Sequence, residues 1–416
     1  MLARSFARQA RAKCTRTASA AFSSLPNDPV IVSFARTPVA SFQGDFAHLT
    51  APQLGSIAAR GAIERAGIEA DLIQEAFLGN VIATGQGQAP TRQVVLGAGI
   101  PNSVPCTTIN KVCASGTKSV MIGAMSIMTG HQDIVLCGGF ESMSNIPYHL
   151  PKARAGLRLG DSSIVDGLVS DGLWDPYGNT HMGVCGEKCS EEYNISREAQ
   201  DDYALESYAR AKAAWESGAT AEEIVPVDAG QRGVEKLVTE DSEFKLLKAD
   251  KIKTLRPAFQ KDGTVTAANS SKINDGAAAM VVMSAARAKE LGCTPILRIR
   301  GFGDAAQEPY KFTTSPALAV PIAAKHAGVS MTDIEYHEIN EAFSVVALAN
   351  IELMNLDPAR VNANGGAVAL GHPIGMSGAR IIGALHTVLK QNDATLGAVS
   401  ICNGGGGAAA MILERV

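Results

Sequence analysis

Short apolar runs alternate with longer segments of helical spacing along most of the chain. The runs at 30–32, 76–78 and 133–137 predict buried strands. Residues 51–66 predict a helix, because their apolar positions recur at helical spacing, a proline stands in the first turn and Gly67 follows the last turn. Strands that alternate with helices in this way predict an α/β architecture whose strands are mostly buried.

One short apolar segment occurs twice. GAAAMVV at 276–282 recurs as GAAAMIL at 407–413, 131 residues later. Each copy follows a polar or glycine-rich approach and predicts a buried strand, as a duplicated domain would give. Strand character resumes at 295–299, where the second half is expected to open. The stretch from 145 to 273 is more polar and charged, and we expect it to be an insertion or lid.

Composition narrows the class of protein. The chain has 416 residues, 46% hydrophobic and 19% charged, which is enough for a large core and disfavours disorder. Its 41 glycines follow no period of three, so a collagen-like chain is excluded. No stretch approaches the roughly 18 uninterrupted apolar residues of a membrane helix, so no membrane span is expected.

Charge is distributed unevenly. Residues 1–27 contain five basic residues, several serines and threonines and no acid, which is typical of a mitochondrial transit peptide. The alternative is a disordered basic arm. Without this segment the net charge of the chain moves from −4 to −9. The rest of the protein is therefore acidic, which disfavours general binding of nucleic acid.

The eight cysteines are scattered, and we interpret them as reduced thiols. His181, Cys185 and Cys189 are spaced by four and suit one helix face, but a zinc site lacks a clear fourth ligand. Cys113 stands in NKVCASG at 110–116, just before a helix of small residues. Because a helix N-terminus favours thiolate, we expect a lowered pKa and a nucleophile there. The alternative is a buried, inert cysteine.

Three further segments carry candidate chemistry. His372 lies in a tight glycine loop at 364–375, where packing explains it poorly, so a general base is favoured. Cys402 precedes four glycines, whose backbone N–H groups suit an oxyanion. Asn340 opens NEAF, which alone also fits an ordinary helix cap. With no P-loop, dinucleotide fingerprint or serine elbow in the sequence, these segments together point to acyl transfer through a thioester.

These segments resemble those of the thiolases, most of all the thiolases that act on acetoacetyl-CoA. The resemblance covers essentially the whole chain after the leader. Its motifs are HMG at 181–183, TVTAANSS at 264–271, NEAF at 340–343, GGAVALGHPIGMSGAR at 365–380 and ICNGGGG at 401–407.

The resemblance implies a duplicated α/β fold with a five-layer αβαβα core and an inserted loop domain that binds CoA. Residues 28–144 with 274–294 would form the N-terminal domain, 145–273 the loop domain and 295–416 the C-terminal domain. It also implies a homotetramer in the mitochondrial matrix.

The resemblance assigns roles at the reacting centre. Cys113 matches the acylated nucleophile, His372 its base and Cys402 the cysteine that exchanges a proton with the α-carbon. Asn340 and His372 would form one oxyanion hole through a water, and the N–H groups of Cys113 and Gly404 the other. Making a carbon–carbon bond requires an acyl group bound covalently to the enzyme and, at the same time, a carbanion equivalent, so the nucleophile and the α-carbon base are two different cysteines. Negative charge develops on two thioester oxygens, so two oxyanion sites are needed.

The resemblance implies further binding residues. For CoA and substrate they are Tyr208, Lys248, Lys251, Ser271 and His181. A potassium ion would be held by Tyr208, Ala267, Ala268, Ser270 and Val368. The implied reaction joins two acetyl-CoA reversibly into acetoacetyl-CoA and CoA, with no prosthetic group.

Two alternatives stay open at this point. One is a broad-range 3-ketoacyl-CoA thiolase, which needs a longer acyl tunnel. The other is a non-catalytic protein that binds acyl-CoA or lipid on the same fold. Two departures bear on specificity: Phe312-Thr313 stands where the branched-substrate enzyme has a phenylalanine-proline pair, and Gly186 replaces the usual alanine.

Overall fold

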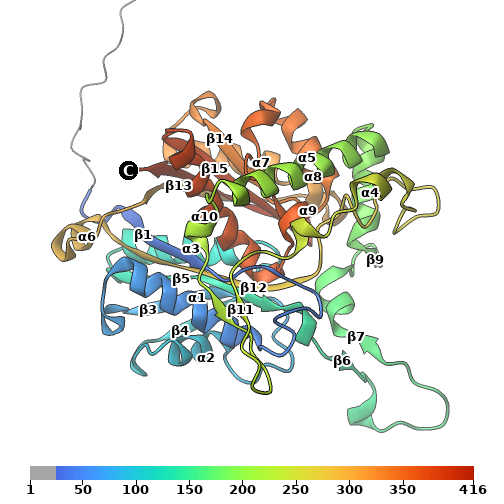
Figure 1. Ribbon diagram of the computed structural model, residues 1–416, viewed down its shortest axis with the longest axis horizontal. Helices are drawn as coiled ribbons and strands as arrows, with labels where there is room; N and C mark the ends of the chain where they lie inside the picture. Colours follow the sequence, from blue (N-terminus) through green and yellow to red (C-terminus); the bar gives the residue numbers. More distant parts are fainter. Residues whose placement is uncertain (1–24) are drawn as a thin grey trace, which may run out of the picture.

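The computed structural model describes residues 25–416, so residues 1–24 of the predicted leader lie outside the described residues. A ten-stranded sheet runs through the molecule in the order β14-β15-β16-β13-β1-β12-β5-β3-β4, with β2 paired to β12 (Figure 1). Its strands are β1 Pro29–Arg36, β2 Ala40–Ser41, β3 Glu75–Gly79, β4 Cys106–Ile109, β5 Ile134–Ser142, β12 Asn274–Ser284, β13 Leu297–Ala306, β14 Tyr336–Ile339, β15 Leu396–Asn403 and β16 Gly407–Arg415.

Helices cover both faces of this sheet, and the one predicted over 51–66 is confirmed. Thr50 caps it, Pro52 stands in its first turn, and Gly67 ends it with a left-handed φ of 65°. The helices are α1 Ala51–Ala66, α2 Pro90–Gly97, α3 Ser115–Met128, α4 Met182–Glu192, α5 Arg197–Glu216, α6 Ala285–Leu291, α7 Pro316–Ala327, α8 Ser344–Leu353, α9 Ala367–Leu370 and α10 Ile374–Gln391.

The two halves of the sheet are copies of one arrangement. The order β3-β5-β12-β1 in the first half corresponds to β14-β15-β16-β13 in the second. The repeated segment falls in β12 and β16, and each copy pairs antiparallel with its neighbours. A register shift lies opposite Val282 in one copy and opposite Leu413 in the other, which are 131 residues apart. The duplication predicted from the repeat is therefore present in the fold.

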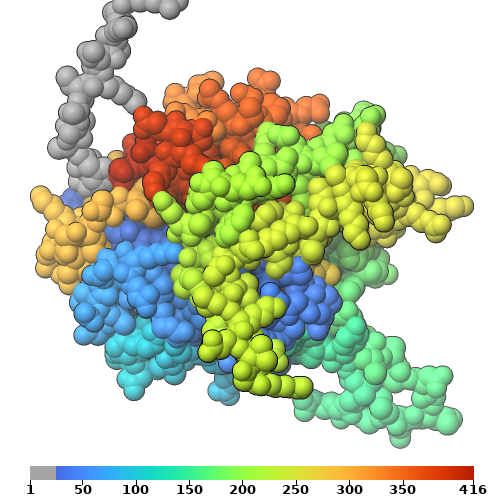
Figure 2. All heavy atoms as spheres, viewed as in Figure 1, coloured from blue at the N-terminus to red at the C-terminus, as the bar shows by residue number. Residues whose placement is uncertain are grey.

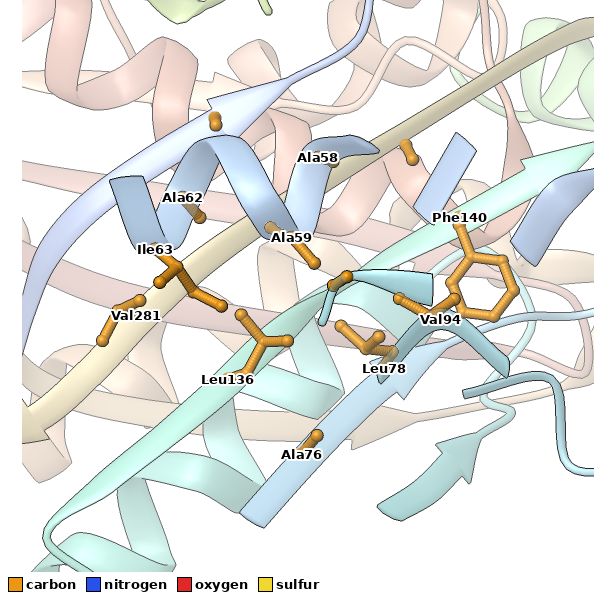
Figure 3. Packing of buried hydrophobic residues seen from close by; sticks show 14 of the residues in the cluster. Ala58, Ala59, Ala62, Ile63, Ala76, Leu78, Val94, Leu136, Phe140 and Val281 are labelled. Atoms are coloured by element: carbon orange, nitrogen blue, oxygen red, sulfur yellow. The ribbon is translucent and has the colours of Figure 1, made fainter. Parts of the chain in front are cut away.

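Alternation along the repeated strands builds the layers. In β12, Ala277, Ala279 and Val281 face a core under α1 and α2, part of which Figure 3 shows, whereas Ala278, Met280 and Val282 face α3 and α10. In β16 the odd residues from Ala409 also face α3 and α10, and the even ones from Ala408 face α7. The two halves of the sheet therefore lie in separate layers. The layers follow one another as helices, first half of the sheet, helices, second half of the sheet, helices.

The small residues of the central helices serve a close approach. A Cβ on Gly116 of α3 would lie 2.6 Å from the backbone nitrogen of Ala379 in α10. One on Gly378 would lie 2.5 Å from the backbone nitrogen of Thr117. The N-terminal ends of α3 and α10 therefore touch through their backbones, which brings the loops before them together.

The region between β5 and β12 begins with a projecting ribbon, formed by its first two strands. Besides α4 and α5, it contains β6 Tyr148–His149, β7 Val165–Asp166, β8 Trp174–Asp175, β9 Thr180–His181, β10 Val227–Asp228 and β11 Leu237–Val238. The β6–β7 ribbon stands away from the body (Figure 2). No helix among residues 25–416 is long and apolar enough to cross a membrane.

Candidate active site

Cys113 sits on a tight turn directly before α3. Val112 has a φ of 48°, an unfavourable conformation for a β-branched residue. Ser115 fixes the turn: its hydroxyl donates to the Val112 carbonyl at 2.6 Å and accepts from the Lys111 N–H at 2.8 Å. This geometry presents the Cys113 side chain to a small cavity instead of to the helix.

The thiol of Cys113 is less acidic than the sequence suggests. Burial raises its pKa to about 11, although its own N–H and that of Gly404 bond to the sulfur and oppose the rise. The expectation of a pKa lowered by the helix N-terminus is therefore wrong for the free protein, because desolvation of the thiolate outweighs the favourable dipoles. A thiol in this state needs a base to react.

His372 has the properties of that base. Its Nδ1 lies 2.5 Å from the Ser377 hydroxyl, which itself donates to the Pro373 carbonyl at 2.9 Å. Ser377 therefore accepts from Nδ1–H, which leaves Nε2 as the unprotonated nitrogen. Burial, helped by the charge of Arg380, lowers the pKa of His372 to about 3. The resting imidazole is neutral.

Asn340 follows β14 and reaches the same imidazole. Its Nδ2 lies 3.5 Å from the His372 Nε2. Its Oδ1 is buried and has no hydrogen-bond partner among the described residues. The amide of Asn340 and the imidazole of His372 are thus close enough to bind one water or one thioester oxygen together.

Two buried glutamates that the sequence analysis missed hold these loops. Glu341 accepts from the N–H of Val368 at 3.0 Å and from three side chains, those of Tyr203, Ser207 and Asn362. Glu141 accepts from the N–H groups of Val81, Ile82 and Gly375. The signal of Glu141 in the sequence is one acid inside an otherwise apolar or small-residue segment, whereas Glu341 closes a segment with several acids and has no such signal.

Cys402 is the last but one residue of β15 and is fully buried. Burial raises the pKa of its thiol well above the ordinary value, and the charge of Cys113 raises it further. The following turn contains Gly405 and Gly406, whose φ values of 85° and 87° explain part of the glycine run. Gly404 is thereby placed with its N–H toward Cys113.

Two cavities meet at these groups. The smaller, of about 60 Å³, is lined by Cys113, His372 and Gly404 and closed by Leu173, Phe312 and Phe343 among others. The larger, of about 500 Å³, shares His372, Phe343 and Leu173 with it. Of the predicted binding residues, His181, Ser271, Ala267 and Ser270 line the larger cavity.

The remaining predicted binding residues lie elsewhere. Lys248 and Lys251 are exposed and line neither of these two cavities. Tyr208, Ala268 and Val368 share a buried hydrophobic cluster. His181 stacks on Phe259 with ring centroids 4.7 Å apart, and its Nδ1 accepts from the Gly183 N–H.

Comparison with known proteins places this site in a family. The model of the thiolase N-terminal domain matches residues 29–286, and that of the thiolase C-terminal domain matches residues 293–415. The chain belongs to the thiolase family. It is therefore an acyltransferase, and its fold is the thiolase fold.

Curated relatives share this family over nearly their full length. The chain is 54% identical to the acetyl-CoA acetyltransferase of Schizosaccharomyces pombe, over 93% of this chain and 98% of the relative. It is 52% identical to the mitochondrial acetyl-CoA acetyltransferase of Bos taurus, over 98% and 97%. The solved Acat5 thiolase from Ascaris suum in complex with coenzyme A is 43% identical with a TM-score of 0.88, covering 94% of this thiolase and 100% of that chain.

Proposed function

We propose that this thiolase is an acetyl-CoA acetyltransferase that interconverts two acetyl-CoA with acetoacetyl-CoA and CoA. The observation that carries the proposal is the cavity of about 60 Å³ that contains both Cys113 and His372. Since one water needs about 10–15 Å³ of such space, this cavity offers room for an acetyl group and little room for a long acyl chain. The names of the curated relatives support the same substrate class.

In the cleavage direction, Cys113 attacks the 3-keto carbon of acetoacetyl-CoA and its thiol proton passes to Nε2 of His372. Nε2 of His372, which is unprotonated in the resting site, would accept this proton. The N–H groups of Cys113 and Gly404, which bond the sulfur in the resting site, would stabilise the negative charge on the attacked oxygen.

The bond between C2 and C3 then breaks, leaving acetyl-Cys113 and the enolate of acetyl-CoA. Asn340 and His372 would stabilise the enolate oxygen, and Cys402 gives its proton to C2. Burial keeps Cys402 protonated, the form that this step needs. The sulfur of free CoA then attacks acetyl-Cys113, which gives acetyl-CoA and releases Cys113. The thiol proton of CoA and the proton held on His372 return Cys113 and Cys402 to the thiol form. Condensation runs the same steps in reverse.

The larger cavity would hold the arm of CoA, with Ser271 and His181 on its wall. Lys248 and Lys251, which have no ion-pair partner among the described residues, are left for the phosphates outside it. No cofactor chemistry is needed for the proposed steps, since each uses a thiol, an imidazole or a hydrogen-bond donor of the chain.

A substrate panel tests the proposal. We expect a higher kcat/KM for acetoacetyl-CoA than for 3-ketohexadecanoyl-CoA, and no turnover by Cys113→Ala. A preference for the long chain would replace the proposal with the broad-range thiolase. An inactive wild type whose CoA binding is unchanged in Cys113→Ala would favour a non-catalytic acyl-CoA-binding protein.

We also propose a mitochondrial location and a homotetramer. Residues 1–27 and the mitochondrial relatives support the location, although another relative, from Gibberella zeae, is cytosolic. The projecting β6–β7 ribbon supports self-association, because Leu157, Leu159 and Ile164 are exposed on it. Fractionation of cells that express the full chain and light scattering of the purified protein test the two points.

A further inference from the structure

The side chain of Lys272, which lines the larger cavity, bridges two loops. Its ammonium Nζ donates to the carbonyl of Ser270 at 2.6 Å and to that of Val368 at 3.3 Å. It also faces the ring of Tyr208, 5.7 Å from the ring centroid. Two carbonyl dipoles and an aromatic face form a cage for a monovalent cation, and the ammonium fills it.

This cage overlaps the potassium site that the thiolase resemblance implies. Tyr208, Ser270 and Val368, three of the five predicted potassium ligands, are the groups that the ammonium contacts. A potassium ion on the same carbonyls would lie against Nζ, and the two positive charges would repel each other. The residues present therefore do not fit a potassium ion.

Acidic neighbours compensate the positive charge of Lys272. Glu243 and Glu341 act on its ammonium as counter-charges. Both acids are fixed: Glu341 by the four donors described above, and Glu243 by the amide of Asn274 at 3.0 Å. The ammonium is thus provided with both hydrogen-bond acceptors and counter-charges.

We propose that the ammonium of Lys272 takes the place of the potassium ion, so that the cation of this site is part of the chain. The backbone carbonyl of Lys272 also accepts the N–H of His372 at 3.2 Å. Lys272 therefore ties the loop of Ser270 and Ser271, which lines the larger cavity, to the loop that carries the base. This role of Lys272 does not depend on the reaction proposed above.

Salt exchange on three proteins tests the replacement. Wild type, Lys272→Ala and the exposed control Lys325→Ala are melted in KCl and in choline chloride of equal ionic strength. Wild type and Lys325→Ala should give the same Tm in both salts. Lys272→Ala, whose carbonyls are vacated, should melt a few degrees higher in KCl, and its KM for acetoacetyl-CoA should fall several-fold there.

Rubidium, which scatters anomalously and mimics potassium, gives a second measurement. Wild-type crystals soaked in RbCl should show no anomalous peak between the carbonyls of Ser270 and Val368. A peak there, or a wild-type Tm that rises in KCl, would overturn the replacement. A folded Lys272→Ala whose Tm is the same in KCl and in choline chloride would also overturn it. If that variant does not fold, the two wild-type measurements decide. A wild type that is inactive, in a set of proteins whose Tm values follow the expected salt pattern, would count against the proposed reaction only.

Discussion

Ser377 holds His372 in one tautomer. The 2.5 Å contact between Nδ1 and the hydroxyl, with the hydroxyl proton committed to the Pro373 carbonyl, leaves Nε2 free to accept a proton. The two residues are five positions apart, and Ser377 lies in the first turn of α10, which begins at Ile374 just after the loop of His372. The start of a rigid helix thus orients the base, and Ser377 acts as a positioning residue.

Replacing Ser377 by alanine should lower kcat by about tenfold, part of the roughly 10²–10⁴-fold that a positioned base supplies. The imidazole keeps its place but loses the acceptor that selects its tautomer. KM for acetoacetyl-CoA should change little, because the serine does not line either cavity. Ser344→Ala is a matched control, since its buried hydroxyl has no partner among the described residues. An unchanged kcat in Ser377→Ala would contradict the role.

Gly186→Ala should stabilise the protein by about 0.5–1 kcal/mol, because glycine inside a helix costs that much relative to alanine. Gly186 lies within α4, and a Cβ there would meet Val265 and Phe343 at an ordinary 3.4–3.5 Å. Gly183→Ala in the same helix should destabilise, since its Cβ would lie 2.2 Å from the Phe259 ring. Urea unfolding at one protein concentration compares them, and equal effects would refute the packing argument.

Leu173→Ala should admit longer acyl chains. Leu173 lines both cavities at their junction, so shortening it enlarges the space beside Cys113. Burying one added methylene is worth ~0.8 kcal/mol, or about fourfold in kcat/KM, so the ratio for 3-ketohexanoyl-CoA over acetoacetyl-CoA should rise by at least that factor. The exposed Leu159→Ala is the control. If the ratio is the same in both variants, Leu173 does not limit chain length.

Much of the fold could be predicted because its signals are local. The helix over 51–66 has its start and stop residues within the segment, and the repeat at 276–282 and 407–413 marks equivalent strands. Cys113, His372 and Gly404 also come together as expected, since each stands in a loop beside a central helix or strand.

What the sequence did not reveal depends on contacts between distant segments. The pairing of Lys272 with the carbonyl of Val368 joins residues 96 positions apart, and no spacing rule marks it. The strained φ of Val112 is imposed by the surrounding turn, whereas valine by itself argues against it. The acidity of Cys113 was predicted in the wrong direction, because helix position is visible in a sequence and burial of a loop residue is not.

The raised pKa of Cys113 predicts how the thiol reacts with iodoacetamide. Since only thiolate is alkylated, and the pKa lies near 11, the rate should rise about tenfold for each pH unit between 7 and 9. A lowered pKa would instead give a rate that levels off near neutrality. Mass spectrometry of the peptide that contains Cys113 follows the rate, and prior acetyl-CoA should slow it by forming acetyl-Cys113. His372 cannot mask this dependence: with a pKa near 3 it is neutral throughout the range, so the slope belongs to the thiol. A plateau between pH 7 and 9 would mean that the dipole at the start of α3 outweighs burial after all.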